Sequence, residues 1–186
     1  MKDITGEPVF YENNLLAYEV FESVGLHSHV QRPILKRVAE KIYLQYDHLD
    51  ALTSLATLNK AKLVAILESN RELFIMQGLL SSLIIDVDRT LSNIGILEDN
   101  VIFYDFDHTF GQPSGALVLD VQCRETFILL APSTKEIKSA IEIIKNSLLG
   151  KRYFYVNDKA NDFIYLNLMD TTLLYSLHSE ILSKDN

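Results

Sequence analysis

The sequence predicts an α+β protein in which an N-terminal helical segment is followed by a mostly antiparallel sheet. Three observations support this fold class. Leucine and isoleucine residues recur at helical spacing between residues 49 and 69. Residues 116–124 alternate between apolar and polar side chains, which is typical of a half-buried strand. Ser133-Thr-Lys-Glu136 fits a capping box, in which the serine and the glutamate satisfy free N–H groups at the start of a helix.

The composition indicates one globular unit. The chain has 186 residues, of which 48% are hydrophobic, so a sizeable core is expected. The formal net charge of −8 argues against nucleic-acid binding, because neutralising phosphates requires clustered Lys and Arg. Cys123 is the single cysteine, so a reducing compartment is expected. The first residues lack an apolar signal core, and the longest apolar segment, 73–85, is shorter than the roughly 20 residues that cross a bilayer. We therefore expect a cytoplasmic protein with no membrane span.

Four helices are predicted in the N-terminal half, residues 1–92. The fourth is apolar on most faces and should lie centrally. Within it, Gly78 and Ser82 are small and four residues apart, which permits a neighbouring helix to approach closely. In chain order, the four helices run from Asn13 or Asn14 to Gly25, from Ser28 to Leu44, from Leu49 to Ser69 and from Arg71 to Leu91.

The C-terminal half, residues 93–186, is predicted as a helix, three strands, helix, two strands, helix unit that packs with the first half. The first helix of this unit is the end of the preceding one, from about residue 83. The segments 111–115 and 157–162 are dense in turn-forming residues and separate neighbouring strands. The elements that follow are strands 101–109, 116–124 and 127–131, a helix over 133–149, strands 153–156 and 163–168, and a helix from Asp170 or Thr171 to Ile181.

One stretch of the C-terminal half carries a candidate catalytic motif. Asp105-Phe-Asp107-His-Thr109 follows an apolar strand and resembles the first motif of the haloacid dehalogenase superfamily. The resemblance implies a Mg²⁺-dependent phosphohydrolase in which Asp105 attacks phosphorus and Asp107 acts as general acid and base. A carboxylate nucleophile needs cations beside it to approach an anionic phosphate.

Further segments resemble the later motifs of the same superfamily. Ser133 and Thr134 follow an apolar run and Lys151 follows the next helix, so the resemblance implies that Ser133 or Thr134, together with Lys151, would hold the phosphoryl group. Asp158 and Asp162 resemble the acidic metal motif, so together with Asp105 they would bind Mg²⁺.

Three observations weigh against this catalytic interpretation. The same pattern occurs a second time, as Asp86-Val-Asp-Arg-Thr90, inside a segment predicted to be helical. The superfamily places a crossover helix after the first strand, but residues 111–125 alternate with a period of two. The acidic loop 157–162 lies between two predicted strands, where Asn and Asp are favoured for turns in any case.

From about residue 83 to residue 182 the chain resembles class I type III secretion chaperones. The resemblance lies in the acidity, in the predicted order of elements and in the segment Thr126-Phe-Ile-Leu-Leu-Ala-Pro-Ser133, with the amphipathic helix and the predicted hairpin after it. It implies a homodimer with exposed apolar surface that holds an extended, non-globular segment of a partner protein. The first eighty residues depart from that family.

The sequence therefore favours a non-catalytic protein-binding adaptor, chaperone-like or regulatory, with no metal or cofactor. In this hypothesis Asp105 and Asp107 are outward residues of a sheet. The Mg²⁺-dependent phosphohydrolase remains an alternative hypothesis. A second alternative is an immunity- or antitoxin-like inhibitor that binds a basic protein through its negative charge.

Overall fold

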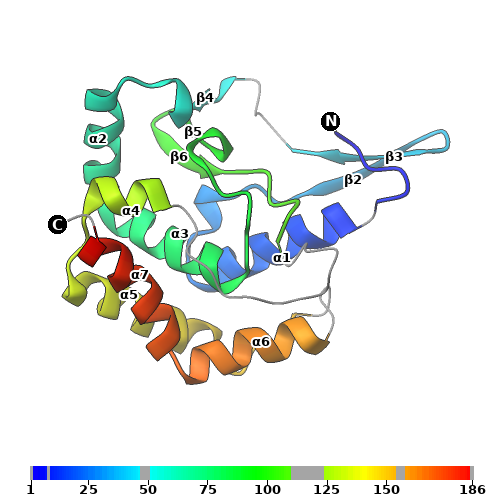
Figure 1. Ribbon diagram of the computed structural model, residues 1–186. Helices are drawn as coiled ribbons and strands as arrows, with labels where there is room; N and C mark the ends of the chain where they lie inside the picture. The colour runs from blue at the N-terminus through cyan, green and yellow to red at the C-terminus, as the bar shows by residue number, and fades with distance from the viewer. Residues whose placement is uncertain (1, 8, 47–50, 110–123, 154–157, 185–186) are drawn as a thin grey trace.

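The computed structural model describes residues 2–7, 9–46, 51–109, 124–153 and 158–184. Over these residues it confirms the α+β class, with seven α-helices and two antiparallel sheets of three strands each. Figure 1 shows one sheet packed above the helices and the other projecting from the side of the molecule. No helix among the described residues is both long and apolar enough to cross a bilayer.

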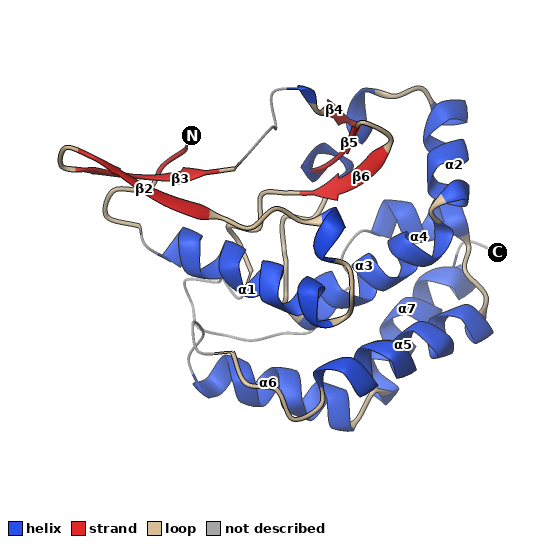
Figure 2. Cartoon of the chain, turned by 180° about the vertical axis from the view of Figure 1, so that it is seen from behind, coloured by secondary structure: helices blue, strands red, loops and turns tan. Residues whose placement is uncertain are grey.

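The projecting sheet is formed by the first part of the chain. Strand β1 (Lys2–Asp3) is followed by helix α1 (Val9–Ser23), a 3-10 turn (His27–His29) and the strands β2 (Ile34–Val38) and β3 (Lys41–Gln45). The strands lie in the order β1-β3-β2, so β2 is an edge strand. Both views of the molecule show the β2–β3 hairpin extending beyond the helices (Figures 1 and 2).

This hairpin corrects the prediction of a helix from Ser28 to Leu44. The apolar residues Ile34, Val38 and Ile42 recur every four positions, which fits one face of a helix. In the structure, Val38 instead pairs with Lys41 across a two-residue turn, and Ile42 pairs with Arg37. Because the turn contains no glycine, asparagine or proline, the usual sequence signal for a hairpin is missing.

The second sheet packs on the helical body. Strand β4 (Thr53–Ser54) and a 3-10 turn (Leu55–Thr57) precede helices α2 (Lys60–Ser69) and α3 (Arg71–Leu83). A 3-10 turn (Leu91–Asn93) then leads into β5 (Ile94–Leu97) and β6 (Asn100–Phe103), and the strand order is β4-β5-β6. The predicted helices 49–69 and 71–91 are therefore present over 60–69 and 71–83. The predicted strand 101–109 ends at Phe103.

The last part of the chain is helical where it is described. It contains α4 (Arg124–Leu130), α5 (Thr134–Leu148), α6 (Asp158–Met169) and α7 (Thr172–Lys184). The strands predicted over 127–131 and 163–168 are wrong, because these residues lie in α4 and α6. A short apolar run such as Phe127–Leu130 fits a buried strand and a buried helix equally well.

Two further predicted strands fall largely outside the described residues. The strand 116–124 does so except for Arg124, which begins α4, and the strand 153–156 does so except for Tyr153. The predicted order of three strands, helix and two strands is therefore not the observed one. The resemblance to the secretion chaperones was based in part on this predicted order of elements.

Helix α3 lies at the centre of the core, as its sequence predicts. All residues from Phe74 to Leu83 are buried, and α3 packs against α4, α5 and α7. A Cβ atom built on Gly78 would lie 2.2 Å from the Phe127 ring of α4. Ser82 forms a hydrogen bond of 3.1 Å with His178 of α7. The small side chains of Gly78 and Ser82 thus allow α4 and α7 to approach α3 closely, which confirms the prediction made from their spacing.

The division at residues 92 and 93 stays an interpretation of the sequence. Strand β4 from the first segment pairs with β5 from the second, with Thr53 opposite Ile96. One hydrophobic cluster also contains residues of both segments, from Leu16 to Leu174.

Candidate functional site

The two Asp-x-Asp-x-Thr segments meet inside the protein. The first, residues 86–90, follows the end of α3, and the second, residues 105–109, follows the end of β6. Asp86 and Thr109 form an isolated antiparallel bridge, and both residues are fully buried. The two copies of the motif are therefore in contact with each other and belong to one polar network.

Arg89 is the centre of the first half of this network. Its Nε donates to Asp86 Oδ2 at 2.7 Å, and both side chains are fully buried. A second nitrogen donates to the carbonyls of Asn93 and Tyr104, at 2.7 Å each, and the guanidinium lies 4.0 Å from the Phe106 ring centroid. Burial raises the pKa of Asp86, and the neighbouring Arg89 charge opposes that rise. The pair thus ties the end of α3 to both ends of the β5–β6 hairpin.

Asp107 is the centre of the second half. Its side chain is 2% exposed and accepts a hydrogen bond of 2.7 Å from Asn14 Nδ2 and another from the Lys2 ammonium. Its carbonyl accepts from Asn13 Nδ2, and Asn14 Oδ1 accepts from the Phe106 N–H at 3.0 Å. Asp107 therefore attaches α1 and β1 to the segment after β6, and it is not an outward residue of a sheet.

Asp105 lies at the surface end of the same network. It has a φ of 59°, in the left-handed region that Asp tolerates better than most residues. Its carboxylate is 3.7 Å from the Lys2 ammonium, which therefore lies between Asp105 and Asp107. Strand β6, which precedes Asp105, pairs antiparallel with β5.

The other residues of the catalytic hypothesis lie elsewhere. Ser133 caps the start of α5 and Lys151 follows its end. A helix of 15 residues spans about 22 Å, so these two side chains cannot hold one phosphoryl group. Asp158 begins α6, and the Asp162 carboxylate is 3.9 Å from Arg152. Among the described residues no group of three acidic, histidine or cysteine side chains is arranged to hold a metal ion.

Magnesium does not fit the two motif carboxylates in this arrangement. Carboxylate oxygens are suitable Mg²⁺ ligands. One oxygen of Asp107 is bonded to Asn14 and the other to Lys2, however, and the ammonium already supplies a positive charge to the pair. The arrangement of Lys2, Asp105 and Asp107 stabilises the fold and leaves no free carboxylate pair for phosphate chemistry.

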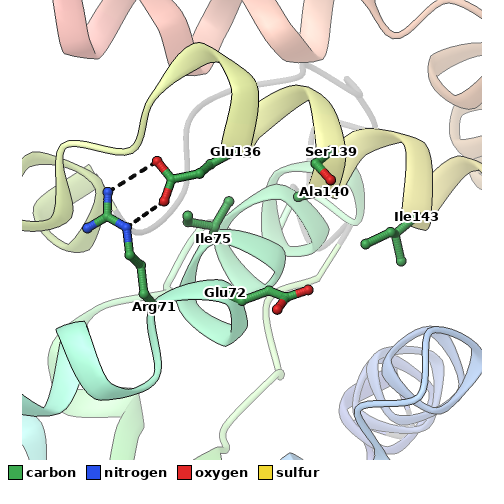
Figure 3. A pocket seen from close by; sticks show the side chains of 7 residues that line it. All are labelled: Arg71, Glu72, Ile75, Glu136, Ser139, Ala140 and Ile143. Carbon is green, nitrogen blue, oxygen red and sulfur yellow. Dashed lines mark hydrogen bonds and ion pairs between the residues drawn. The ribbon is translucent and has the colours of Figure 1, made fainter.

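A groove lies between α3 and α5, beside a charged cluster (Figure 3). Its volume is about 330 Å³, and Ile75, Ala140 and Ile143 form its apolar lining. At one end Arg71 Nε donates to Glu136 Oε1 at 2.6 Å. The contact with Arg71, together with hydrogen bonds from Ser133, lowers the pKa of Glu136 to about 2. The charged groups at this end are mutually satisfied and join α3 to α5.

The β1-β3-β2 sheet is the most exposed apolar surface among the described strands. Ile34, Leu35, Val38 and Ile42 are between 37% and 47% exposed. Every residue of β2 is exposed. Large apolar side chains gathered on a projecting element are typical of interaction sites.

The outer edge of β2 also carries free backbone groups. Ile42 of β3 uses its carbonyl to accept from Ile4 and its N–H to donate to Thr5 Oγ1, both on the β1 side. Ile42 and its partner Arg37 are therefore a non-hydrogen-bonded pair, so the N–H and C=O of Arg37 point away from β3. By the alternation of an antiparallel ladder, the same holds for Leu35. We call this outward side of Ile34–Val38 the β2 edge.

Sequence reasoning missed the β2 edge because residues 28–44 were predicted to be helical. One signal could have indicated it. Ile34, Val38 and Ile42 are β-branched, and such residues favour strands over helices. Lys36 and Arg37 are exposed on this strand.

Comparisons with known proteins identify no relative. No family model matches the chain, and neither curated proteins nor solved structures yield a match.

Proposed function

We propose that this protein is a non-catalytic binding adaptor that takes up an extended segment of a partner protein along the β2 edge. The observation that carries the proposal is the pair of free backbone positions, Leu35 and Arg37, on an exposed edge strand. An added strand would satisfy these groups, and this mode of peptide recognition is common at sheet edges.

The surrounding side chains support an extended occupant. Apolar side chains project from both faces of β2, with Ile34 and Val38 on one face and Leu35 on the other. An extended segment presents side chains to both faces in the same alternation. It could therefore cover apolar surface on either side of the strand.

The charge of the edge favours a partner with acidic residues. Lys36 and Arg37 are exposed side chains in a chain with a net charge of −8. A second copy is a poorer occupant of this edge, because antiparallel self-pairing centred on Lys36 would place two lysines opposite each other.

Peptide selection followed by hydrogen exchange tests the proposal. A displayed library of random peptides is selected against the purified protein, and the bound peptides are mapped by amide exchange. We expect enrichment of extended peptides that slow exchange at Leu35 and Arg37. Failure to enrich any peptide, or protection confined to another surface, contradicts the proposal.

A matched pair of variants at Leu35 sharpens this test. Leu35→Ala and Leu35→Pro both replace the leucine side chain by a smaller one, but only the proline substitution also removes the outward N–H, and the β2–β3 ladder does not use that N–H. We expect the alanine variant to keep most of the affinity and the proline variant to lose it. Equal affinities for the two variants would exclude strand addition.

The remaining hypotheses stay separate proposals. The phosphohydrolase hypothesis requires Mg²⁺-dependent turnover of a generic phosphate ester that Asp105→Asn abolishes, and the contacts of Lys2 with Asp105 and Asp107 do not support it. The immunity-like hypothesis requires a basic partner, whereas the β2 edge is itself basic. A cytoplasmic location also remains a proposal.

The homodimer is also a proposal, and helix α6 offers a surface for it. Tyr165, Leu166 and Met169 are 47%, 63% and 51% exposed and lie on the face of α6 opposite its buried residues. A self-complementary contact through this face would leave the β2 edge free.

A further inference from the structure

We infer that the partner segment carries two consecutive acidic residues between apolar residues, in the order apolar, acidic, acidic, apolar. This inference rests on the proposed function, because it specifies the segment that the β2 edge would take up. It follows from the order of side chains along β2 and from the two faces to which they point.

The faces of β2 are fixed by its register with β3. Leu35 and Arg37 are opposite Leu44 and Ile42 and share their face. Leu44 is 1% exposed, so this face turns toward the body of the protein at its base. Ile34, Lys36 and Val38 lie on the other face, opposite Gln45, Tyr43 and Lys41.

Two neighbouring positive charges therefore point to opposite faces of one strand. Lys36 points to the outer face and Arg37 to the face that turns toward the body. A residue of an added strand shares a face with the β2 residue directly opposite, where cross-strand charges interact most strongly. One acidic residue on the partner can satisfy only one of the two charges, so two in succession are needed.

The flanking positions demand apolar residues. Leu35 precedes the charged pair and Val38 follows it, and each is 47% exposed. An apolar residue opposite either one would remove apolar surface from water on both strands. The pattern apolar, acidic, acidic, apolar is the same in both directions. A peptide that carries it can therefore match residues 35–38 in a parallel or in an antiparallel orientation.

Within the part of the chain that the structure describes, neither charge is neutralised by an acidic side chain. Lys41 on the hairpin forms an ion pair with Asp3, at 2.9 Å, and among the described residues no ion pair engages Lys36 or Arg37. The nearest acidic residue on the hairpin, Glu40, lies in the turn beyond Val38. With respect to the described residues, the two cations are thus available for charges of the partner.

Three synthetic peptides test the pattern. One carries Val-Glu-Glu-Val at the centre of a Ser/Thr-rich sequence, the second carries Val-Lys-Lys-Val, and the third carries Glu-Val-Val-Glu with the same composition as the first. Dissociation constants come from fluorescence anisotropy with the full-length protein. We expect the first peptide to bind about tenfold more tightly than the second, which corresponds to about 1.4 kcal/mol, and severalfold more tightly than the third.

A charge-reversed protein provides the matched control. In Lys36→Glu/Arg37→Glu the preference should invert, so that the lysine peptide binds more tightly than the glutamate peptide. Both positions are exposed, and circular dichroism checks that the hairpin is retained. An inverted preference supports direct contact between these side chains and the peptide.

The outcomes separate this inference from the proposed function. Equal binding of the first and third peptides, with protection of Leu35 and Arg37, overturns the acidic pair and leaves strand addition standing. Equal binding of the first and second peptides likewise overturns the acidic pair and leaves strand addition standing. Absence of binding by all three, together with a library that enriches nothing, overturns both.

Discussion

Single side chains decide how the interior of this protein accommodates charge. Asp86 and Arg89 are buried together, and Arg89 also satisfies the carbonyls of Asn93 and Tyr104. A buried pair of this kind contributes little net stability, but removal of one partner leaves the other as an uncompensated charge. This structural role could not be predicted, because the motif that contains Asp86 resembles a catalytic pattern.

We expect Asp86→Asn to reduce the free energy of unfolding by about 3–5 kcal/mol, since the buried Arg89 guanidinium would lose its ion pair with the Asp86 carboxylate. Chemical denaturation monitored by circular dichroism measures the change. Asp88→Asn is the matched control, because Asp88 belongs to the same segment but is exposed, and its effect should be within about 0.5 kcal/mol. Equal effects of the two substitutions would show that the ion pair is not important for stability.

His178 is a second buried group with a defined consequence. It is fully buried in α7, with its ring 4.4 Å from that of Phe127, and burial lowers its pKa to about 3. The unfolded chain takes up a proton at this residue near pH 6.5, but the folded protein does not do so until about pH 3. The contribution of neutral His178 to stability is therefore complete above pH 6.5 and declines as the pH falls toward 3.

We expect the stability difference between the native protein and His178→Gln to narrow by about 1.4 kcal/mol for each pH unit below 6.5. Denaturation midpoints between pH 7 and pH 5 measure this slope. His27→Gln, at an exposed position, is the matched control. A native protein with the same pH profile as His178→Gln would show that His178 is protonated in the folded state.

At the scale of elements, the turn between β5 and β6 is conformationally strained. Glu98 and Asp99 have φ values of 48° and 70°, and Leu97 pairs with Asn100 across these two residues. Two consecutive positive φ values define a type I′ turn, in which glycine is strongly preferred at the second position. The turn thus holds two acidic residues where Asn-Gly would be favoured.

We expect Asp99→Gly to stabilise the protein by up to about 1 kcal/mol, because glycine adopts this φ without steric cost. For a chain of this size, that corresponds to about 2–4 °C in Tm. Asn100→Gly is the control, since Asn100 lies in β6 with no positive φ, and it should lower Tm. A lower Tm for Asp99→Gly would indicate that its carboxylate makes a stabilising contact.

Elements with strong local signals could be predicted from the sequence. The capping box at Ser133 and Glu136 is present, and α5 follows it over nearly the predicted range. Helices α1, α3 and α7 are also found where helical spacing indicated them, but α1 begins at Val9, so the predicted caps Asn13 and Asn14 lie inside the helix. The hairpin at residues 34–45 and the helices α4 and α6 could not be predicted, because their apolar patterns fit either type of structure and tertiary packing decides between them.

At the scale of the whole molecule, the buried polar network joins parts that are distant in the sequence. Lys2, Asn14 and Asp107 connect β1, α1 and the segment after β6. The same contacts anchor the base of the projecting sheet, whose tip carries the exposed residues of β2. The candidate catalytic residues could be found from the sequence, but their structural role depends on contacts between residues that are 93 to 105 positions apart, which no local pattern reveals.

The arrangement of α6 gives the last prediction, which concerns assembly. If a second copy contacts the exposed face of α6, light scattering after size exclusion should give a mass of twice 21.2 kDa. Leu166→Glu places a charge in the centre of this apolar face, and its desolvation should shift the mass to that of the monomer. Val9→Glu is a matched control, because Val9 is a similarly exposed apolar residue on α1 and should leave the dimer unchanged. A monomeric native protein would exclude α6 as a dimer interface. A Leu166→Glu variant that remains dimeric would exclude it as well, since the substitution is made at the centre of the exposed face of α6.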